Sequence, residues 1–368
     1  MTRKHIGSDL MLVVGTRPEI IKMAPVVRAL LDIDQRFVLV HTCQHSDYEL
    51  SCRFFKELGL PNPDHSLSMG ASPPTVQTAK MMMGIDRIVD RVQPRLMLIQ
   101  GDTNSMLAAA LTGFKSQVHV GHVEAGLRSY DWRMPEEHNR RMVDHASEYL
   151  FAPTEVAKGN LLDEKVPGKI WVTGNTVIDS VIQHLPMADR RLKVLEQLSF
   201  QEYLLATAHR AENVDDPMTL KNIVEAFEES PLPVVFPVHP RTLNRLRSQG
   251  ILRRLSRSRN VKLMKPQGYF DFLVLMRHCK GIITDSGGLQ EEATAPLLRK
   301  AVLVMRRSTE RPEAVQTGFA RVAGTDKGGI LEGIESFLMK ETDLPTVSPY
   351  GDGHAGKRIV RIMTEELL

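Results

Sequence analysis

Cysteine is scarce in this sequence. Only Cys43, Cys52 and Cys279 occur among 368 residues, and no two of them form a C-x-x-C pair. Three irregularly spaced cysteines exclude a disulfide framework and a cysteine-based zinc site. They suit a reducing compartment, in which each thiol packs as a small apolar side chain. We therefore expect a cytoplasmic protein.

Long apolar runs are also absent. The apolar run nearest the N-terminus, residues 10–14, is short, and Arg17 and Glu19 follow it closely. A signal peptide needs about 7–15 apolar residues and a membrane-spanning helix about 20. The sequence thus predicts neither a signal peptide nor a membrane partner.

No charge of one sign dominates. The chain has 47 lysines and arginines against 44 aspartates and glutamates, a net charge of +3. This balance gives no electrostatic reason to expect nucleic acid as a partner, although a local basic pocket could bind a small anion. Hydrophobic residues at 42% and charged residues at 25% indicate a folded globular chain. Its length favours two domains of about 170 residues each.

The sequence instead shows a regular alternation of short apolar runs and amphipathic stretches. Strands are expected at residues 10–14, 37–42, 96–100, 118–123, 149–152 and 170–172, with helices at 19–31, 75–92 and 104–114. After a polar stretch around residues 186–191, strands recur at 203–206, 234–238, 261–264, 281–284 and 301–305. Such alternation predicts an α/β fold whose doubly wound sheets contain parallel strands joined by helical crossovers.

The interruption of this alternation predicts two domains. We expect an N-terminal Rossmann-like domain over residues 1–175 and a C-terminal Rossmann-like domain over residues 176–353. Two such domains in series favour an active site in the interdomain cleft, outside the carboxyl ends of the strands.

Two strand-to-helix loops have features of phosphate-binding sites. In the first, Gly15 permits a tight turn, Arg17 lies at the positive end of the next helix, and Lys22 follows about one turn later. A plain βα turn would also explain this loop. The second, Asp285-Ser286-Gly287-Gly288, is the stronger signal, because consecutive glycines let backbone N–H groups converge on a phosphate.

Motifs for nucleotide cofactors and metals are missing. Neither G-x-G-x-x-G nor G-x-x-x-x-G-K-[ST] occurs at the expected places, which argues against NAD-dependent and NTP-hydrolysing chemistry. H-E-x-x-H is missing too, and the histidines are interleaved with arginines, which repel a metal cation. We therefore expect no cofactor and no metal.

Ionisable residues gather at the strand ends in larger numbers than turns require. Each alone could be a helix cap, a buried core histidine or a solvated carboxylate. Together they provide carboxylates for proton transfer and cations for an anionic leaving group. The set consists of Asp102, His122, Glu124, Asp131, Glu136 and Arg140 in the first half, and of His209, Arg210, His239, Arg241, Glu310, Arg311 and Glu313 in the second.

Short motifs follow one another in order from about residue 10 to residue 360. They are residues 15–22 (GTRPEIIK), 101–103 (GDT), 122–128 (HVEAGLR), 135–140 (PEEHNR), 209–213 (HRAEN), 285–288 (DSGG), 309–313 (TERPE) and 349–353 (PYGDG). Together they resemble the non-hydrolysing UDP-N-acetylglucosamine (UDP-GlcNAc) 2-epimerases. Residues 43–50 (CQHSDYEL) look more like the archaeal branch, because bacterial members have Gly-Gln-His at this place.

The resemblance implies a fold and a reaction. The fold would be GT-B-like, with two Rossmann-like domains and a last helix, residues 354–368, that crosses back onto the first. The reaction would be reversible C2 epimerisation of UDP-GlcNAc to UDP-N-acetylmannosamine (UDP-ManNAc), by elimination of UDP to 2-acetamidoglucal and re-addition. By family habit the protein would be a homodimer that acts on small-molecule substrates.

The resemblance also implies residue roles. Asp102, Glu124 and Glu136 would be the candidates for proton exchange, while Arg140 and His209 would stabilise the departing UDP. Glu310 would bind the ribose. The other residues of the UDP site would be Arg17, Lys22, His239, Arg241, Ser286, Gly287, Gly288 and Arg311. Gln44 and His45 lie in the segment that, in bacterial members, helps to hold a second UDP-GlcNAc as an activator.

Alternatives remain at this level. A hydrolysing epimerase of the same fold would release UDP and free ManNAc, and a glycosyltransferase would need an acceptor site. A non-catalytic nucleotide-sugar-binding regulator is a third alternative. Such a regulator should have lost some of Asp102, Glu124, Glu136 and His209, and all four are present.

Overall fold

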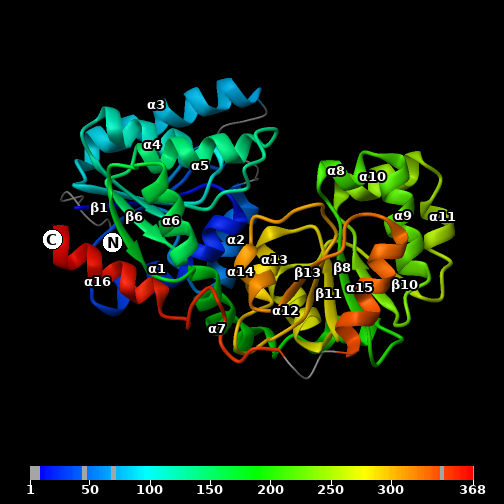
Figure 1. Ribbon diagram of the computed structural model, residues 1–368. Coiled ribbons are helices and arrows are strands. Elements are labelled where there is room, and N and C mark those ends of the chain that lie inside the picture. The colour runs from blue at the N-terminus through cyan, green and yellow to red at the C-terminus, as the bar shows by residue number, and fades with distance from the viewer. Residues whose placement is uncertain (1–8, 44–47, 68–71, 340–343, 368) are drawn as a thin grey trace. The chain divides into compact units, whose positions relative to one another are not determined.

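The chain forms two α/β units. The computed structural model describes residues 9–43, 48–67, 72–339 and 344–367. The first compact unit consists of Met1–Ser180 together with Gly353–Leu368. The second consists of Val181–Asp352. Each unit contains one parallel sheet flanked by helices (Figure 1). The predicted pair of Rossmann-like, doubly wound domains is therefore confirmed.

The first unit has a seven-stranded sheet in the order β3-β2-β1-β4-β5-β6-β7. Its strands are β1 (Leu10–Val14), β2 (Val38–His41), β3 (His65–Ser66), β4 (Leu96–Gln100), β5 (His119–Val123), β6 (Tyr149–Ala152) and β7 (Lys169–Val172). Its helices are α1 (Arg17–Asp32), α2 (Tyr48–Glu57), α3 (Pro74–Val92), α4 (Asn104–Lys115), α5 (Pro135–His145), α6 (Glu155–Asp163) and α16 (Ala355–Leu367). The strand order reverses between β1 and β4, which is where such sheets bind ligands.

The second unit repeats this plan with six strands in the order β10-β9-β8-β11-β12-β13. Its strands are β8 (Leu204–Thr207), β9 (Val234–Pro237), β10 (Val261–Met264), β11 (Gly281–Thr284), β12 (Val302–Val304) and β13 (Ala320–Val322). Its helices are α8 (Ala211–Val214), α9 (Pro217–Glu228), α10 (Pro240–Ser248), α11 (Leu252–Leu255), α12 (Tyr269–His278), α13 (Gly287–Glu292), α14 (Pro312–Gln316) and α15 (Lys327–Met339). Here the order reverses between β8 and β11, so the loops after these strands form the second expected ligand site.

The connection between the units is helical. Helix α7 (Thr176–Ala188) contains the boundary, because Ser180 belongs to the first unit and Val181 to the second. A short 3-10 helix, η1 (Leu192–Gln197), follows it. Most of the polar stretch expected as a junction therefore lies in the end of α7 and the turn after it. Buried Leu185 and Ala188 explain why this stretch is helical despite its polar neighbours.

The C-terminal helix α16 packs against α1 near the N-terminus of the chain (Figure 1). Gly356 allows the close approach, since a Cβ atom there would lie 2.8 Å from the carbonyl carbon of Pro25. The backbone N–H of Gly356 also donates to Asp179 at 2.9 Å. Helix α16 therefore completes the first unit.

Both cores are built from the central strands. Every residue of β1, β4, β8 and β11 is buried except Thr207, which is half-buried. Fully buried strands suit a parallel sheet that has helices on both faces.

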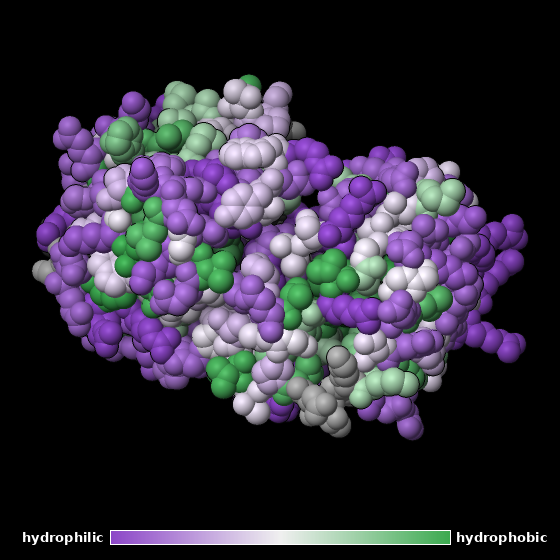
Figure 2. Space-filling model, viewed as in Figure 1, coloured by the Kyte–Doolittle hydropathy of each residue, from purple (hydrophilic) through white to green (hydrophobic). Residues whose placement is uncertain are grey.

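Acidic residues are unevenly distributed along the chain, and residues 230–270 contain none. Exposed Arg253, Arg254 and Arg257 of this segment contribute to the hydrophilic surface around α11 (Figure 2).

Candidate functional site

Glu124 lies directly after β5 in the first unit. Its φ of +71° is in the left-handed region, which costs a non-glycine residue about 1–3 kcal/mol. Its Oε2 accepts hydrogen bonds from Nζ of Lys22 at 2.5 Å and from Nε2 of Gln100 at 2.6 Å. The predicted phosphate ligand Lys22 is thus paired here with a buried carboxylate whose backbone is held in a costly conformation.

Asp102 lies in the turn between β4 and α4. Arg140 of α5 donates to its Oδ2 through Nε at 3.2 Å and through Nη2 at 2.6 Å. Arg140 also contacts Glu137 at 2.8 Å. The structure therefore brings Asp102 and Arg140 together, as candidate carboxylate and candidate cation.

The two acidic residues at the start of α5, Glu136 and Glu137, differ in solvent exposure and in ion pairing. Glu137 is fully buried and pairs with Arg140 and Arg141. Glu136, the predicted acid/base candidate, is exposed, and it has no ion pair or hydrogen bond within the described part of the chain. Since neighbouring helical residues differ by about 100° in direction, the sequence did not show which of the two faces inward.

Glu19 is a buried carboxyl that joins two loops. It accepts hydrogen bonds from the N–H groups of Gly15 at 2.5 Å and Thr16 at 2.8 Å, and from the hydroxyl of Thr103 at 2.6 Å. Burial raises the pKa of Glu19 to about 7, against these hydrogen bonds and with a small contribution from Asp102. This carboxyl therefore connects the loops after β1 and β4 and titrates near neutral pH.

Two further candidates of the first unit, Arg17 and Asp131, lie at or near the surface. Arg17 is exposed, with its guanidinium 5.6 Å from the centre of the Phe54 ring. Asp131 pairs with exposed Arg133 at 2.8 Å. The expected activator segment, residues 44–45, falls outside the described part of the chain.

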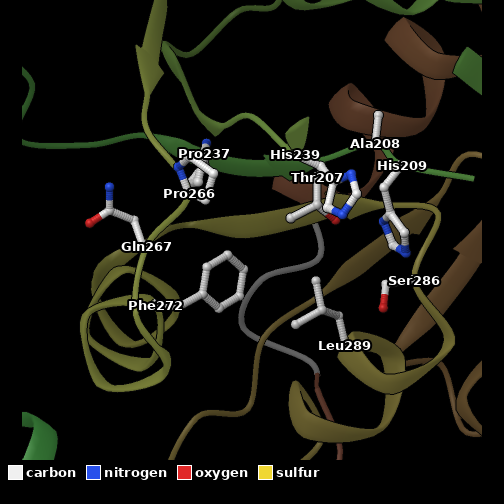
Figure 3. Close-up of a pocket in the computed structure, with 10 residues that line it drawn as sticks. All are labelled: Thr207, Ala208, His209, Pro237, His239, Pro266, Gln267, Phe272, Ser286 and Leu289. Carbon is white, nitrogen blue, oxygen red and sulfur yellow. The ribbon is translucent and has the colours of Figure 1, made fainter. Parts of the chain in front are cut away.

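A cavity of about 190 Å³ lies beside the end of β8 in the second unit. Figure 3 shows His209, His239 and Ser286 close together in its lining, with the apolar side chain of Leu289 beside Ser286 and the ring of Phe272 further to the left. A mostly apolar pocket with a few convergent polar groups is the usual form of a small-molecule site.

Asp285 orients His209. Nδ1 of His209 lies 3.0 Å from one oxygen of Asp285. The other oxygen accepts from the N–H groups of His209 at 2.8 Å and Arg210 at 2.9 Å, and from the amide of Asn213 at 3.2 Å. Burial would raise the pKa of Asp285, but His209 and the backbone donors outweigh it, so that the pKa is lower than usual. An ionised Asp285 thus fixes the ring of His209 and leaves Nε2 for a ligand.

His239 caps helix α10. Its Nδ1 accepts a hydrogen bond from the N–H of Arg241 at 3.2 Å, so a neutral ring carries its proton on Nε2. Burial, together with neighbouring His209 and Arg241, lowers the pKa of His239. His239 therefore offers a neutral Nε2–H donor rather than a positive charge. The side chain of Arg241 pairs with Asp215, as does Arg245.

Buried Glu310 is surrounded by guanidinium groups. It contacts Arg306 and, at 3.1 Å, Arg210, while Arg311 lies next to it in the chain. Burial would raise its pKa, but Arg311, Arg306 and Arg210 lower the pKa of Glu310 to about 2. The carboxylate expected to bind the ribose is therefore held ionised by three fixed cations.

The two glycines of the 285–288 loop have different surroundings. A Cβ atom at Gly287 would lie 2.6 Å from Oε1 of Glu310, so a side chain there would displace this carboxylate. A Cβ atom at Gly288 would meet nothing within 4 Å. Half-buried Ser286 precedes them and lines the cavity. Gly287 is thus required for packing, whereas Gly288 leaves open space beside the backbone.

Known proteins resemble this chain in sequence and in fold. A family model described as UDP-N-acetylglucosamine 2-epimerase matches residues 31–364. The chain belongs to this family. It is accordingly an isomerase by family, and the resemblance inferred from the ordered motifs is confirmed.

Two relatives, one of them also with a crystal structure, show how far this chain resembles other members of the family. The UDP-N-acetylglucosamine 2-epimerase of Methanocaldococcus jannaschii is 42% identical over 364 residues, 96% of this chain and 98% of that protein. A crystal structure of the M. jannaschii enzyme with UDP-GlcNAc and UDP has a TM-score of 0.87 at 41% identity, and covers 97% of this chain and 99% of that one. The UDP-2,3-diacetamido-2,3-dideoxy-D-glucuronate 2-epimerase of Pseudomonas aeruginosa is 37% identical over 363 residues, 97% of this chain and 99% of that protein. The similarity to an archaeal member is thus confirmed.

Two features are absent from the part of the chain that the structure describes. No helix there is both long and apolar enough to cross a membrane. Among the same residues, no group of three or more His, Cys, Asp or Glu side chains is placed to hold a metal ion.

Several buried residues at the two sites were not given a role from the sequence. Glu19, Glu137, Asp285 and Arg306 are buried at the two sites. The first three lie in motifs that had been recognised, and the Thr16–Glu19 spacing of a capping box was a usable signal for Glu19. The contacts of Arg306 with Glu212 and Glu310 depend on the fold.

Proposed function

We propose that this protein interconverts UDP-GlcNAc and UDP-ManNAc by inverting C2 of the sugar. The observation that carries the proposal is a pair of carboxylate–cation couples at the ends of adjacent strands. Asp102 follows β4 and is paired with Arg140 of α5. Glu124 follows the neighbouring strand β5 and is paired with Lys22 of α1. Two carboxylates beside cations can exchange a proton while the cations stabilise a leaving phosphate.

The chemistry of the substrate explains why the site needs both carboxylates and cations. The C2 proton is not acidic, because no carbonyl group of the ring stabilises a carbanion. Elimination avoids this barrier: the C1–O bond breaks with its electron pair leaving on UDP, a base takes the C2 proton, and 2-acetamidoglucal forms. Re-addition of UDP at C1 with a proton delivered to the other face of C2 gives the epimer. Asp102, Glu124 and Glu136 are the candidates for this proton exchange.

We assign binding of UDP mainly to the second unit. Glu310 would accept the ribose hydroxyls, while the open backbone at Gly288 and the hydroxyl of Ser286 would meet the diphosphate. His209, held by Asp285, and the neutral His239 would donate to phosphate oxygens. Arg17, Lys22, Arg140, Arg241 and Arg311 would complete the cationic surroundings of the leaving group. Lys22 and Arg241 would have to exchange their carboxylate partners for phosphate.

A product analysis in D₂O tests the proposal. Starting from UDP-GlcNAc, we expect UDP-ManNAc with deuterium at C2, and the same final mixture from either epimer. Free ManNAc with stoichiometric UDP would instead identify a hydrolysing epimerase. Because one relative is named for UDP-2,3-diacetamido-2,3-dideoxy-D-glucuronate, that sugar belongs in the same assay. If the enzyme turned over only that sugar, the proposed C2 epimerisation would stand, but its substrate would not be UDP-GlcNAc.

We further infer a cytoplasmic homodimer. The inference rests on the family resemblance and on the buried thiols of Cys43 and Cys279, neither of which forms a disulfide, as suits a reducing compartment. Light scattering of the purified protein would test the oligomeric state. Dependence of turnover on added UDP-GlcNAc when UDP-ManNAc is the substrate would test the activator role of Gln44 and His45.

A further inference from the structure

A ring of alternating charges runs through the first unit and closes on Asp102. Asp102 contacts Arg140 at 2.6 Å, Arg140 contacts Glu137 at 2.8 Å, and Arg141 contacts Glu137 at 3.1 Å. The ring continues from Arg141 through Glu164, Arg128 and Asp144 to His122, with contacts of 2.6, 2.7, 2.7 and 2.7 Å. His122 then reaches the carbonyl oxygen of Gly101, the residue before Asp102, at 3.0 Å.

His122 is the buried member that closes this ring. Its side chain is 1% exposed, and Asp144 beside it is fully buried. A carbonyl oxygen only accepts hydrogen bonds, so Nε2 of His122 must carry the proton that faces Gly101. Asp144 contacts Nδ1 at 2.7 Å and is itself fixed by Arg128. The orientation of the imidazole is therefore set from its far side.

The contact with Gly101 controls the backbone of Asp102. A peptide group is planar, so holding the carbonyl of Gly101 also fixes the N–H of Asp102. The next peptide group is held as well, because the amide of Asn139 donates to the carbonyl of Asp102 at 2.9 Å. Both peptide groups that flank the Cα atom of Asp102 are thus fixed, and with them the direction of its Cα–Cβ bond. Gly101 itself has a φ of +87°, so the turn depends on glycine.

We infer that His122 is a positioning residue for Asp102, aligned by Asp144. It does not touch the substrate. Its effect is to hold the carboxylate of Asp102 where Arg140 and the sugar need it, and this inference rests on the role proposed for Asp102. A displacement of about 1 Å at a reacting group can reduce turnover about a hundredfold.

Two substitutions separate the two contacts of His122. In His122→Gln the amide nitrogen takes the place of Nε2 and keeps the donor to Gly101 while losing Asp144. In His122→Asn it takes the place of Nδ1, so that it faces Asp144 and loses Gly101. Each variant keeps one contact of the buried imidazole and loses the other. As long as both variants fold, a merely structural histidine predicts equal turnover in the two.

Positioning predicts unequal turnover. We expect kcat of His122→Asn to fall about a hundredfold with KM within about threefold, and kcat of His122→Gln to stay within about tenfold of wild type. Thr112→Val is the matched control, because it removes another buried hydrogen bond of the first unit, from the hydroxyl of Thr112 to the carbonyl oxygen of Ala108 at 2.7 Å, without touching the ring of charges. Its kcat should be that of wild type.

The outcomes are distinct. Equal kcat values in the Asn and Gln variants, or a rise in KM with kcat unchanged, would overturn the role of His122. If neither variant folds, Asn139→Ala tests the same backbone from the other peptide group and should also lower kcat without raising KM; a normal kcat would then overturn the inference. Absence of C2 epimerisation by the wild type would refute the proposed function instead, and the variants would be compared on the nucleotide sugar that is turned over.

Discussion

Two buried carboxyls, one in each unit, have opposite pKa shifts. Burial alone would raise both, yet the pKa of Glu19 rises to about 7 and that of Glu310 falls to about 2. The difference lies in their neighbours. Glu19 accepts from two backbone N–H groups and a hydroxyl and lies near the carboxylate of Asp102, whereas Glu310 faces three guanidinium groups.

The opposite pKa shifts of Glu19 and Glu310 agree with the function proposed for each unit. Fixed charges at Glu310, Asp285 and the surrounding arginines suit binding of a nucleotide whose charge does not change. A first unit in which one buried carboxyl titrates near pH 7 can gain or lose a proton under ordinary conditions. Similar strand orders in the two sheets therefore support different electrostatics, set by the side chains at the strand ends.

The largest expected effect comes from removing the fixed charge of the second unit. Glu310→Gln leaves Arg306 without its buried carboxylate partner, and breaking such a pair costs about 3–5 kcal/mol. Calorimetry of the variant should show this loss, and UDP affinity should fall with it. Glu229→Gln, which breaks an exposed pair with Lys327, is the control and should leave stability unchanged. Unaltered stability of Glu310→Gln would refute the contrast between the units.

The next effect concerns the proton on Glu19. A glutamate in the unfolded chain has a pKa of 4.5, and burial raises the pKa of Glu19 to about 7, so the folded state favours the protonated form. Stability should therefore be fully present below pH 4.5 and decrease by about 3 kcal/mol as pH rises through 7. Glu19→Gln does not titrate. Its unfolding free energy should thus exceed that of wild type increasingly from pH 4.5 to 8.

The chain provides a local probe for this measurement. Both tryptophans, Trp132 and Trp171, lie in the first unit, so their fluorescence follows unfolding of that unit in urea. Parallel pH profiles of wild type and Glu19→Gln would show that Glu19 does not titrate in this range. The contrast with Glu310 would then be lost.

A slightly smaller effect is expected at His209. His209→Asn removes the ring that Asp285 holds in the cavity, and loss of one positioned charge-stabilising group commonly lowers kcat about a hundredfold, or about 2.7 kcal/mol. UDP affinity, measured by calorimetry, should change much less, because Glu310 and the Gly288 backbone remain. Exposed His278→Asn in the same unit is the control. Turnover near wild type in His209→Asn would remove His209 from the catalytic set.

Much of the fold was predictable because apolar periodicity and strand burial have the same physical origin. Strands β1, β4, β6, β10 and β11 begin and end as predicted. The two-residue strand β3, the three-residue strand β13 and helix α2 were not predicted, because short or irregular elements depend on tertiary contacts rather than on local pattern.

The candidate sites were predictable as motifs but not as contacts. The loops after β1, β4, β8 and β11 were found because glycine and charge follow apolar runs. Whether Glu136 or Glu137 points inward depends on the phase of α5. The ion-pair partners of Lys22 and Arg241 come from residues distant in sequence. Such pairings follow from the sheet order, which the sequence does not state.

The smallest expected effect is that of metal removal. Divalent metals usually neutralise the diphosphate of a nucleotide, but the residues proposed to bind UDP here are donors: the backbone at Gly288, His209, His239 and arginines. The carboxylates best placed to ligate a metal already have cationic partners, namely Arg140 for Asp102, Lys22 for Glu124 and three arginines for Glu310. A metal ion would have to displace them. Turnover of UDP-GlcNAc should therefore be the same before and after exhaustive EDTA treatment and gel filtration. Loss of turnover that Mg²⁺ or Mn²⁺ restores would show that these carboxylates exchange their arginine and lysine partners for a metal.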